Sequence, residues 1–382
     1  MQLVGILAFI VALLTSVMVH EFGHFITAKR YGMKVSEFFL GFGTRLWSFK
    51  RGETEFGIKA IPAGGYCRIE GMTPGDEMPE GEEGRAFYLA SSARKLIVLG
   101  AGSFLHFVLA YFLLFTLFAG VGINQVLPTI NSVIADTAAS AAGFREGDEI
   151  ISINGEKVSK WEDDLAKIRG SRGSELTIVV ARNGEEITII AAPRLTKIDD
   201  GSERYVLGII NSVGTKRISV TESVTRAGSL TWDFTSASAK ALVQLPSKIP
   251  ALWGQTFGNE ARDENGPVGV VGIARVSGQA AANGELSIAQ RAGTFILIVA
   301  SLNVFVGLFN LLPILPLDGG HMAVAIADEV RAFFARLRGR PRPEPIDVKV
   351  LTPVTAVVFV ILAALTLLLL IADIFNPISL NL

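Results

Sequence analysis

The sequence predicts a polytopic α-helical membrane protein with four transmembrane helices and one compact water-soluble domain. Half of the 382 residues are hydrophobic, the mean hydropathy is +0.44, and only 19% of the residues are charged, against about 25% in a soluble domain. Four apolar runs meet or approach the about 20 residues needed to cross hydrocarbon, namely Leu3–Ala28, Leu96–Ile123, Ala292–Leu317 and Leu351–Ala372.

Composition also excludes several classes of function. The net charge is −1 and no tract is rich in Lys or Arg, so nothing indicates a nucleic-acid partner. The single cysteine, Cys67, excludes an internal disulfide and a multi-cysteine zinc site. The first apolar run is not interpreted as a secretory signal, because its basic residues Lys29 and Arg30 follow the run and no A-x-A site comes after it.

Basic residues near the ends of the apolar runs predict the orientation in the cell membrane. They follow the first run, precede the second and lie between the third and the fourth, whereas none precedes the first or follows the fourth. The positive-inside rule then places residues 29–95 and 328–350 in the cytoplasm. Both termini and the long segment 124–291 are expected outside.

Residues 35–70 predict a β-hairpin beside the membrane. Two segments with aromatic and aliphatic residues, Leu46–Lys50 and Thr54–Ala60, flank the turn Arg51–Glu53. A hairpin this apolar either dips into the bilayer, with protein covering its backbone groups, or lies at the surface.

Residues 127–195 predict the soluble domain. Alternating apolar residues and the turn pairs Asn154-Gly155 and Asn183-Gly184 indicate strands over Asp148–Ile153, Leu176–Arg182 and Glu185–Ile190. A short helix over Ala135–Ala142 and a strand over Tyr205–Ile210 are also expected. Residues 216–260 are expected to form helices that lie on the membrane surface or pack against the soluble domain.

A candidate metal motif, His20-Glu21-Phe22-Gly23-His24, lies at the end of the first apolar run. Histidines four apart share one face of a helix, with Cβ atoms about 5–6 Å apart. Both imidazoles can then bind one zinc ion while Glu21 acts as general base on water at the ion. Ionisable residues inside hydrocarbon are costly and indicate function.

Asp318 is the best candidate for a third zinc ligand. It ends the third apolar run, and an aspartate near mid-membrane costs roughly 2.5–3.5 kcal/mol unless something offsets it. The predicted topology puts Asp318 and the H-E-x-x-H motif at a similar depth near the cytoplasmic side. Alternatively, Asp318 caps a helix that follows the break expected at Pro313 and Pro316.

Three further polar residues lie in or beside the apolar runs. Asn310 is expected either to bind the oxyanion or the substrate strand, or to make an interhelical hydrogen bond. His321 is expected in an outer-shell or interfacial role rather than as a metal ligand. His106 is expected to pack or hydrogen-bond within the second run.

With these residues in view, the chain resembles the site-2 protease family of intramembrane zinc metalloproteases, in particular its bacterial members with a PDZ domain. The combination of H-E-x-x-H and L-D-G-G in two separate spans is highly specific. Five segments match in the family's order: HEFGHFITAKRYGMKVSEFFLGFG (20–43), GGYCRIEGM (64–72), the PDZ-like AASAAGFREGDEIISINGEKV (138–158), GPVGVVGIARV (266–276) and NLLPILPLDGGH (310–321).

The resemblance implies a role for each site residue. It implies Zn²⁺ bound by His20, His24 and Asp318, with Glu21 as catalytic base. It also implies that the hairpin dips into the membrane to align substrate. Substrate contacts are then expected at Asn310, Gly64 and Gly65.

The resemblance also divides the chain. It implies two spans with the zinc motif and hairpin over residues 1–123, and an extracytoplasmic PDZ-like α+β domain over 124–215. A membrane-proximal segment over 216–287 and two spans with the L-D-G-G motif over 288–382 complete the division.

Two departures from the family pattern stand out. Leu315 replaces the second proline of N-x-x-P-x-P, with Pro316 one position later. His106 occupies the asparagine position of G-P-x-x-N-F.

The predicted function is that of a membrane endopeptidase that cuts within or next to transmembrane segments, as in regulated intramembrane proteolysis. The expected partners are single-span membrane proteins and the lipid bilayer, and the family suggests anti-sigma factors or signal-peptide remnants as substrates. Two other classes of function are possible alternatives. An ion or metal transporter is disfavoured by four spans without an internal repeat. An inactive binding scaffold is disfavoured by intact Glu21 and all three ligands.

Overall fold

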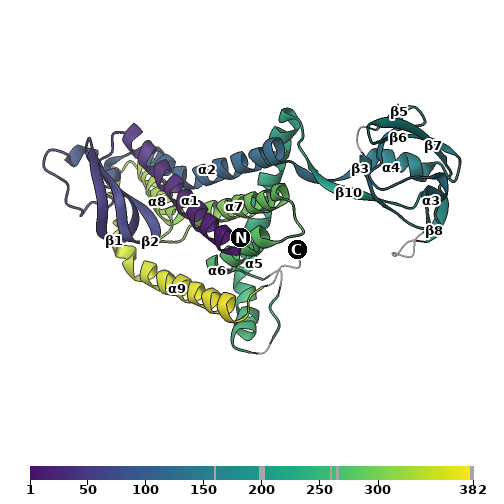
Figure 1. The fold of residues 1–382 in the computed structure, drawn as a ribbon. Helices are drawn as coiled ribbons and strands as arrows, with labels where there is room; N and C mark the ends of the chain where they lie inside the picture. The colour runs from purple at the N-terminus through teal and green to yellow at the C-terminus, as the bar shows by residue number, and fades with distance from the viewer. Residues whose placement is uncertain (159–160, 198–202, 259, 264–265, 379–382) are drawn as a thin grey trace. The chain divides into compact units, whose positions relative to one another are not determined.

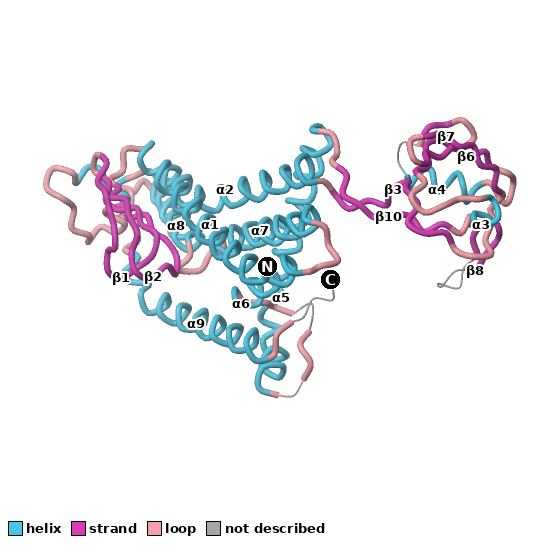
Figure 2. The backbone as a smooth tube through the Cα atoms, viewed as in Figure 1, coloured by secondary structure: helices cyan, strands magenta, loops and turns pink. Residues whose placement is uncertain are grey.

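The computed structural model describes residues 1–158, 161–197, 203–258, 260–263 and 266–378. These residues form two compact units (Figure 1). The first unit comprises Met1–Gly120 and Ser219–Leu382, and the second comprises Val121–Ile218. Helices dominate the first unit and strands the second, as the colouring of Figure 2 makes clear.

Four described helical segments of the first unit are long and apolar enough to cross a membrane, which confirms the prediction of a multi-pass membrane protein. They are α1 (Gln2–Arg30), α2 (Ser92–Thr116) with the π-helical turn that follows it to Val121, α7 (Ile288–Asn310), and α9 (Thr352–Phe375) with the 3-10 turn Val348–Leu351 before it. Helix α2 packs between α1 and α7.

The third apolar run does not continue as a helix to Leu317, as the predicted span did. Helix α7 starts with a capping box between Ser287 and Gln290 and ends at Asn310. An irregular segment with Pro313 and Pro316 follows, and a separate helix, α8 (Asp318–Leu337), begins at Asp318. Proline removes a backbone donor and clashes with the preceding turn, so the chain breaks where the two prolines predict.

The two strands of the hairpin are longer than the predicted segments Leu46–Lys50 and Thr54–Ala60. Strand β1 (Val35–Arg51) pairs with β2 (Thr54–Ile69) across the tight turn at Gly52. Both strands bend, so that Phe38 is paired with Phe56 and also with Cys67. Residues 35–40 therefore lie between residues 55–58 and residues 65–69, and the last of these segments forms an edge of the sheet among the described residues.

Two further helices complete the first unit. Helix α5 (Val220–Phe257) includes Pro246 and Pro250 and packs against α2 and α7, a contact that neither interpretation of residues 216–260 foresaw. Helix α6 (Val270–Ala282) packs against α1 and α9. Short 3-10 turns occur at Glu83–Arg85 and Phe87–Leu89.

The second unit is a small α+β domain. Its main sheet has the order β10-β3-β4-β6-β7, and each of these pairs is antiparallel. The strands are β3 (Ile123–Val133), β4 (Glu149–Ile153), β6 (Leu176–Arg182), β7 (Glu185–Ala191) and β10 (Ile209–Lys216), with β5 (Glu156–Lys157) beside β4. Strands β8 (Arg194–Lys197) and β9 (Glu203–Val206) form a separate pair.

The turn residues and the core of this unit explain its fold. Asn154 and Asn183 take positive φ angles of 51° and 53° ahead of glycines, as a two-residue hairpin turn requires. Helices α3 (Ala138–Ala142) and α4 (Trp161–Gly170) share one apolar core with the sheet. The strand expected over Tyr205–Ile210 is instead interrupted, because Leu207 and Gly208 separate β9 from β10.

Candidate metal centre

Three candidate ligand atoms from two helices converge in the first unit. His20 and His24 lie one turn apart on α1, and their Nε2 atoms are 3.1 Å apart. The Asp318 Oδ2 atom lies 3.1 Å from Nε2 of His20 and 3.3 Å from Nε2 of His24. Among the described residues, these three form the only group of metal-ligand type within 4.8 Å.

The separations fit one tetrahedral ion. Ligand atoms at about 2.0–2.1 Å from zinc stand about 3.3 Å apart, close to the distances among the two histidines and Asp318. Two imidazole nitrogens and a carboxylate oxygen also concentrate lone pairs at one point, where a cation relieves their repulsion. The donor set therefore matches zinc in both spacing and chemistry.

Asp318 occupies this position because α8 begins there. The N-cap residue of α8 is Leu317, which makes no side-chain capping bond. Asp318 is the first helical residue, and its carboxylate faces the two histidines. Residues almost three hundred positions apart thus meet because the irregular segment before Asp318 returns the chain toward α1.

Helix α2 forms one wall of the centre. The Nδ1 atom of His24 donates to the Val98 carbonyl oxygen at 2.8 Å. One turn further along α2, Gly102 faces both rings, and a Cβ atom there would lie 2.6 Å from Cε1 of His20 and from Nε2 of His24. Only glycine fits at this closest approach of α2 to the motif.

A cavity of about 310 Å³ opens on the centre, far more than the about 10–15 Å³ that one water occupies. Glu21 lines this cavity together with the three ligand-type residues. The opposite wall is the edge segment of β2, with Tyr66, Cys67, Arg68 and Ile69. The cavity therefore brings a carboxylate, the metal-ligand group and an edge of the hairpin sheet together.

Three residues expected to contact substrate lie outside this lining. Asn310 is the half-buried last residue of α7. Gly64 takes a φ angle of +146° at the bend of β2. At Gly65 a Cβ atom would lie 2.9 Å from the Met18 sulfur on α1, so this glycine lets the strand approach the helix that carries the motif.

His106 takes part in a buried polar chain beside the centre. Its Nδ1 atom lies 2.8 Å from Asn303 Oδ1, and Asn303 Nδ2 donates to Ser16 Oγ at 3.0 Å. His106 therefore hydrogen-bonds within the membrane region, as expected of a lone histidine on an apolar helix.

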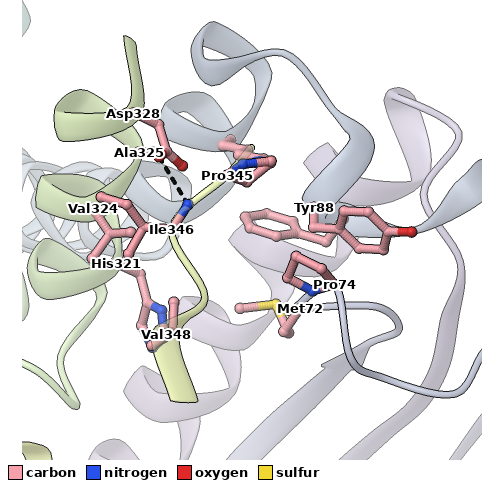
Figure 3. A pocket seen from close by; sticks show the side chains of 12 residues that line it. Met72, Pro74, Tyr88, His321, Val324, Ala325, Asp328, Pro345, Ile346 and Val348 are labelled. Atoms are coloured by element: carbon pink, nitrogen blue, oxygen red, sulfur yellow. Dashed lines mark hydrogen bonds between the residues drawn. The ribbon is translucent and has the colours of Figure 1, made fainter. Parts of the chain in front are cut away.

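His321 faces a different, smaller pocket of about 30 Å³ (Figure 3). This pocket lies between α8, the loop with Met72 and Pro74, and the segment before α9. The Ile346 backbone N–H of that segment donates to Asp328 on α8 at 2.9 Å. Met72 lines both this pocket and the cavity at the metal centre. His321 is not part of the three-residue group.

Val98 has no signal in the sequence, because it contributes through its backbone carbonyl, which any residue type supplies. The edge of β2 falls within the matching segment GGYCRIEGM (64–72), but its position beside Glu21 and the histidines depends on long-range packing. Gly102 had one detectable signal, because glycine in the middle of an apolar helix often marks a close packing contact.

Comparison with known proteins agrees with this geometry. The profile of peptidase family M50 matches residues 8–362. Zinc metalloprotease Rip1 of Mycobacterium tuberculosis is 35% identical, covering 100% of this chain and 99% of its own length. Zinc metalloprotease Rip1 of Mycolicibacterium smegmatis is 31% identical over 98% of each chain. The chain therefore belongs to peptidase family M50, the site-2 protease family of zinc metalloproteases.

Proposed function

We propose that the chain is an intramembrane zinc endopeptidase in which His20, His24 and Asp318 hold the metal and Glu21 is the catalytic base. The observation that carries this proposal is the convergence of three ligand-type atoms within 4.8 Å at the end of an apolar helix. When bound, a zinc ion supplies Lewis-acid activation of water and of the scissile carbonyl.

Glu21 moves the proton in this mechanism. It lies between the two histidines in sequence and lines the same cavity, so its carboxylate reaches a water that enters there. It accepts a proton as the water attacks the carbonyl carbon and then passes the proton to the leaving amine. Asn310 assists by donating to the oxyanion or to the substrate backbone.

The edge of β2 presents the substrate. A transmembrane helix hides its carbonyls in backbone hydrogen bonds and must unwind before cleavage. Residues 65–69 form an edge of the hairpin sheet that lines the cavity, and an extended substrate adds there as a further strand. Gly65 lets this edge lie close to α1, because a Cβ atom there would lie 2.9 Å from the Met18 sulfur. The hairpin dips into the bilayer to meet the substrate, which contacts Gly64 and Gly65 at the bend of β2.

The two units divide the work across the membrane. The distribution of basic residues supports a topology in which both termini and residues 124–215 lie outside the cell and the metal centre lies near the cytoplasmic side. The unit Val121–Ile218, with its own core and antiparallel sheet, acts as a PDZ-like filter against substrates with bulky outer domains. Residues 216–287 connect the filter to the last two spans.

Glu21→Gln tests the chemistry. The variant keeps the side-chain shape but not the base, so it retains bound zinc while cleavage of a single-span reporter falls by about 10²–10⁴-fold. Zinc content and cleavage are measured on the same detergent-solubilised preparation, with chelator-treated and zinc-reloaded wild type beside it. Cleavage by Glu21→Gln at the wild-type rate contradicts the proposal.

Deleting residues 127–210 tests the filter. The shortened protein is expected to cleave a full-length substrate that the intact protein spares, and to cleave a substrate without an outer domain at an unchanged rate. If cleavage of the full-length substrate stays undetectable, the filter is rejected in favour of a receptor for peptide tails.

A further inference from the structure

Nε2 of His20 and Nε2 of His24 lie at similar distances, 3.1 Å and 3.3 Å, from Oδ2 of Asp318. The Nδ1 atoms of the two rings differ in their hydrogen bonding. A metal-ligating histidine almost always donates its other ring N–H to an acceptor, which fixes its orientation. For His24 that acceptor is the Val98 carbonyl. Nδ1 of His20 is buried and has no hydrogen-bond partner among the described residues. One of the two ligands thus lacks the support that the other has.

His106 is the side chain placed to supply this support. Its ring centroid lies 5.0 Å from that of His20, with a 39° angle between the ring planes. Val98, Gly102 and His106 follow one another at intervals of four residues on α2, so they share one face. Val98 contacts His24, Gly102 faces both rings, and a Cβ atom at Gly102 would lie 2.8 Å from Nδ1 of His20. His106 is therefore the next residue on this face of α2 after Gly102, near the unpartnered Nδ1 of His20.

The polar chain fixes which nitrogen of His106 carries the proton. Asn303 places one amide atom 2.8 Å from the Val299 carbonyl. Since a carbonyl only accepts, that atom is the NH₂ group. The other amide atom is therefore an oxygen, which accepts from Nδ1–H of His106 at 2.8 Å. Neutral His106 is left with an unprotonated Nε2, a hydrogen-bond acceptor.

The cost of this arrangement argues for a role beyond packing. His106, Asn303 and Ser16 come from three helices, α2, α7 and α1, and are at most 3% exposed. An apolar residue at each position would fill a transmembrane interface without buried polar groups. The chain reaches α1 at Ser16, one turn before His20, and the Ser16 hydroxyl donates to the Ala12 carbonyl at 2.9 Å.

We infer that His106 is a positioning residue for the metal site: its Nε2 accepts a hydrogen bond from Nδ1–H of His20 when the metal is bound. The bond orients the His20 ring, and Asn303, whose amide is oriented by the Val299 carbonyl, holds His106 in the tautomer that accepts. This inference rests on the proposed role of His20 as a ligand and adds a residue outside the ligand set.

Zinc affinity of the full-length protein in detergent tests this inference. His106→Phe keeps a ring of similar size but no acceptor, and zinc should bind about 10–100-fold more weakly, as measured by competition with a chromogenic chelator. His106→Gln keeps an amide acceptor and should recover most of the affinity. Cobalt provides a second readout, because the visible absorption of the Co²⁺-loaded protein should shift in His106→Phe and return in His106→Gln.

Ser16→Ala is the matched control, since it breaks the far end of the same buried chain without touching the acceptor of His106. It should bind zinc within about threefold of wild type, well short of the loss typical of a missing outer partner. Equal losses in Ser16→Ala and His106→Phe would assign His106 to packing and overturn the inference. So would a His106→Phe protein with wild-type affinity and cobalt spectrum.

Two variants cover the remaining cases. If His106→Phe does not yield folded protein, His106→Leu takes its place in the same comparison with His106→Gln. His20→Ala separates the inference from the proposed function. Unchanged zinc binding in His20→Ala rejects the ligand set itself, whereas loss there with unchanged binding in the His106 variants rejects only the positioning role.

Discussion

Nδ1 of His24 and the backbone carbonyl oxygen of Val98 lie 2.8 Å apart. Since the carbonyl only accepts, neutral His24 carries its proton on Nδ1 and turns a bare Nε2 toward His20 and Asp318. Helix α2 thus sets the tautomer of a candidate ligand on α1 through a backbone atom. Changes that move the backbone of α2 relative to α1 should therefore disturb metal binding, even though α2 supplies no ligand.

Gly102→Ala is expected to weaken zinc binding strongly. The new Cβ atom would lie 2.6 Å from Nε2 of His24 and 2.6 Å from Cε1 of His20, distances at which either α2 or both rings must shift. The affinity for zinc should fall at least about 100-fold, the upper end of the cost of disturbing an outer partner. Chelator competition on purified protein measures it.

Gly100→Ala is the control for that substitution, because it lies on the same helix and its Cβ would meet only the Met322 methyl at 3.7 Å. Replacing a helical glycine by alanine stabilises a helix by roughly 0.5–1 kcal/mol. Gly100→Ala should bind zinc as wild type does and unfold at the same or a higher temperature. Similar zinc affinities for Gly102→Ala and Gly100→Ala would show that the close approach has no bearing on the site.

Asp318→Asn is expected to weaken zinc binding by more than about 100-fold, because loss of a direct charged ligand should exceed the about 10–100-fold typical of outer partners. The amide keeps the shape of the side chain, so folding should be retained. Asp328→Asn serves as control, since this aspartate lies on the same helix and bonds only the loop before α9 and Arg331 among described residues. Equal zinc content in Asp318→Asn and wild type would exclude Asp318 as a ligand.

The sequence predicts much of the membrane part, because its signals are strong there. About 20 apolar residues in a row have few structural alternatives, and the four spans follow. The predicted third span reaches Leu317, whereas α7 ends at Asn310. Residues 311–317 are as apolar as a span, so their composition does not show where the helix ends. The break itself was predicted from Pro313 and Pro316, because proline acts through a fixed backbone geometry.

Long-range geometry is the part that sequence patterns do not contain. The predicted segments Leu46–Lys50 and Thr54–Ala60 are shorter than β1 and β2, and Gly41, Gly43 and Gly64 lie outside them. In the structure these glycines adopt positive φ angles that bend strands which stay paired. The spacing of the two histidines predicts a metal site. The positions of the Val98 carbonyl and of residues 65–69 beside that site depend on how α2 and β2 pack, which the spacing does not indicate.

Glu53→Gln should destabilise the hairpin at neutral pH and matter less in acid. Hydrogen bonding from Arg85, reinforced by Lys29 and Lys34, lowers the pKa of Glu53 from its usual 4.5 to about 2. A carboxyl with a depressed folded pKa stabilises the fold fully above its unfolded pKa, and that stability is lost as the pH falls through the folded pKa. The loss at pH 7 should be about 3 kcal/mol, because each pKa unit of the shift corresponds to about 1.4 kcal/mol.

Thermal unfolding of both proteins at pH 7 and near pH 2 measures this effect as the difference between Glu53→Gln and wild type. That difference should be largest at pH 7 and shrink as the pH drops from about 4.5 toward 2. Glu80→Gln, an exposed carboxyl in the following loop, should change little at either pH. A difference that stays constant with pH would show that the carboxylate charge of Glu53 contributes nothing.

Asp373→Ala is expected to loosen the contact between α9 and α6. Asp373 is 1% exposed, and its Oδ2 accepts from the Gly272 backbone N–H at 2.8 Å near the start of α6. Its Oδ1 faces Nη2 of buried Arg262 at 3.4 Å. Removing one partner of a buried ion pair leaves the other charge uncompensated, which costs about 3–5 kcal/mol. The exposed Asp233→Ala on α5 is the control and should be neutral within about 0.5 kcal/mol.

A double variant separates the charge effect from loss of packing. Replacing both members of a buried pair by apolar residues is often neutral or stabilising, so Arg262→Met with Asp373→Leu should be more stable than Asp373→Ala alone. Proteolysis of residues 260–270 and thermal unfolding report the order of stabilities. If the double variant is no more stable than the single one, the charge of Arg262 has little influence on the contact between α6 and α9. The stabilising interaction at Asp373 is then the hydrogen bond from the Gly272 N–H.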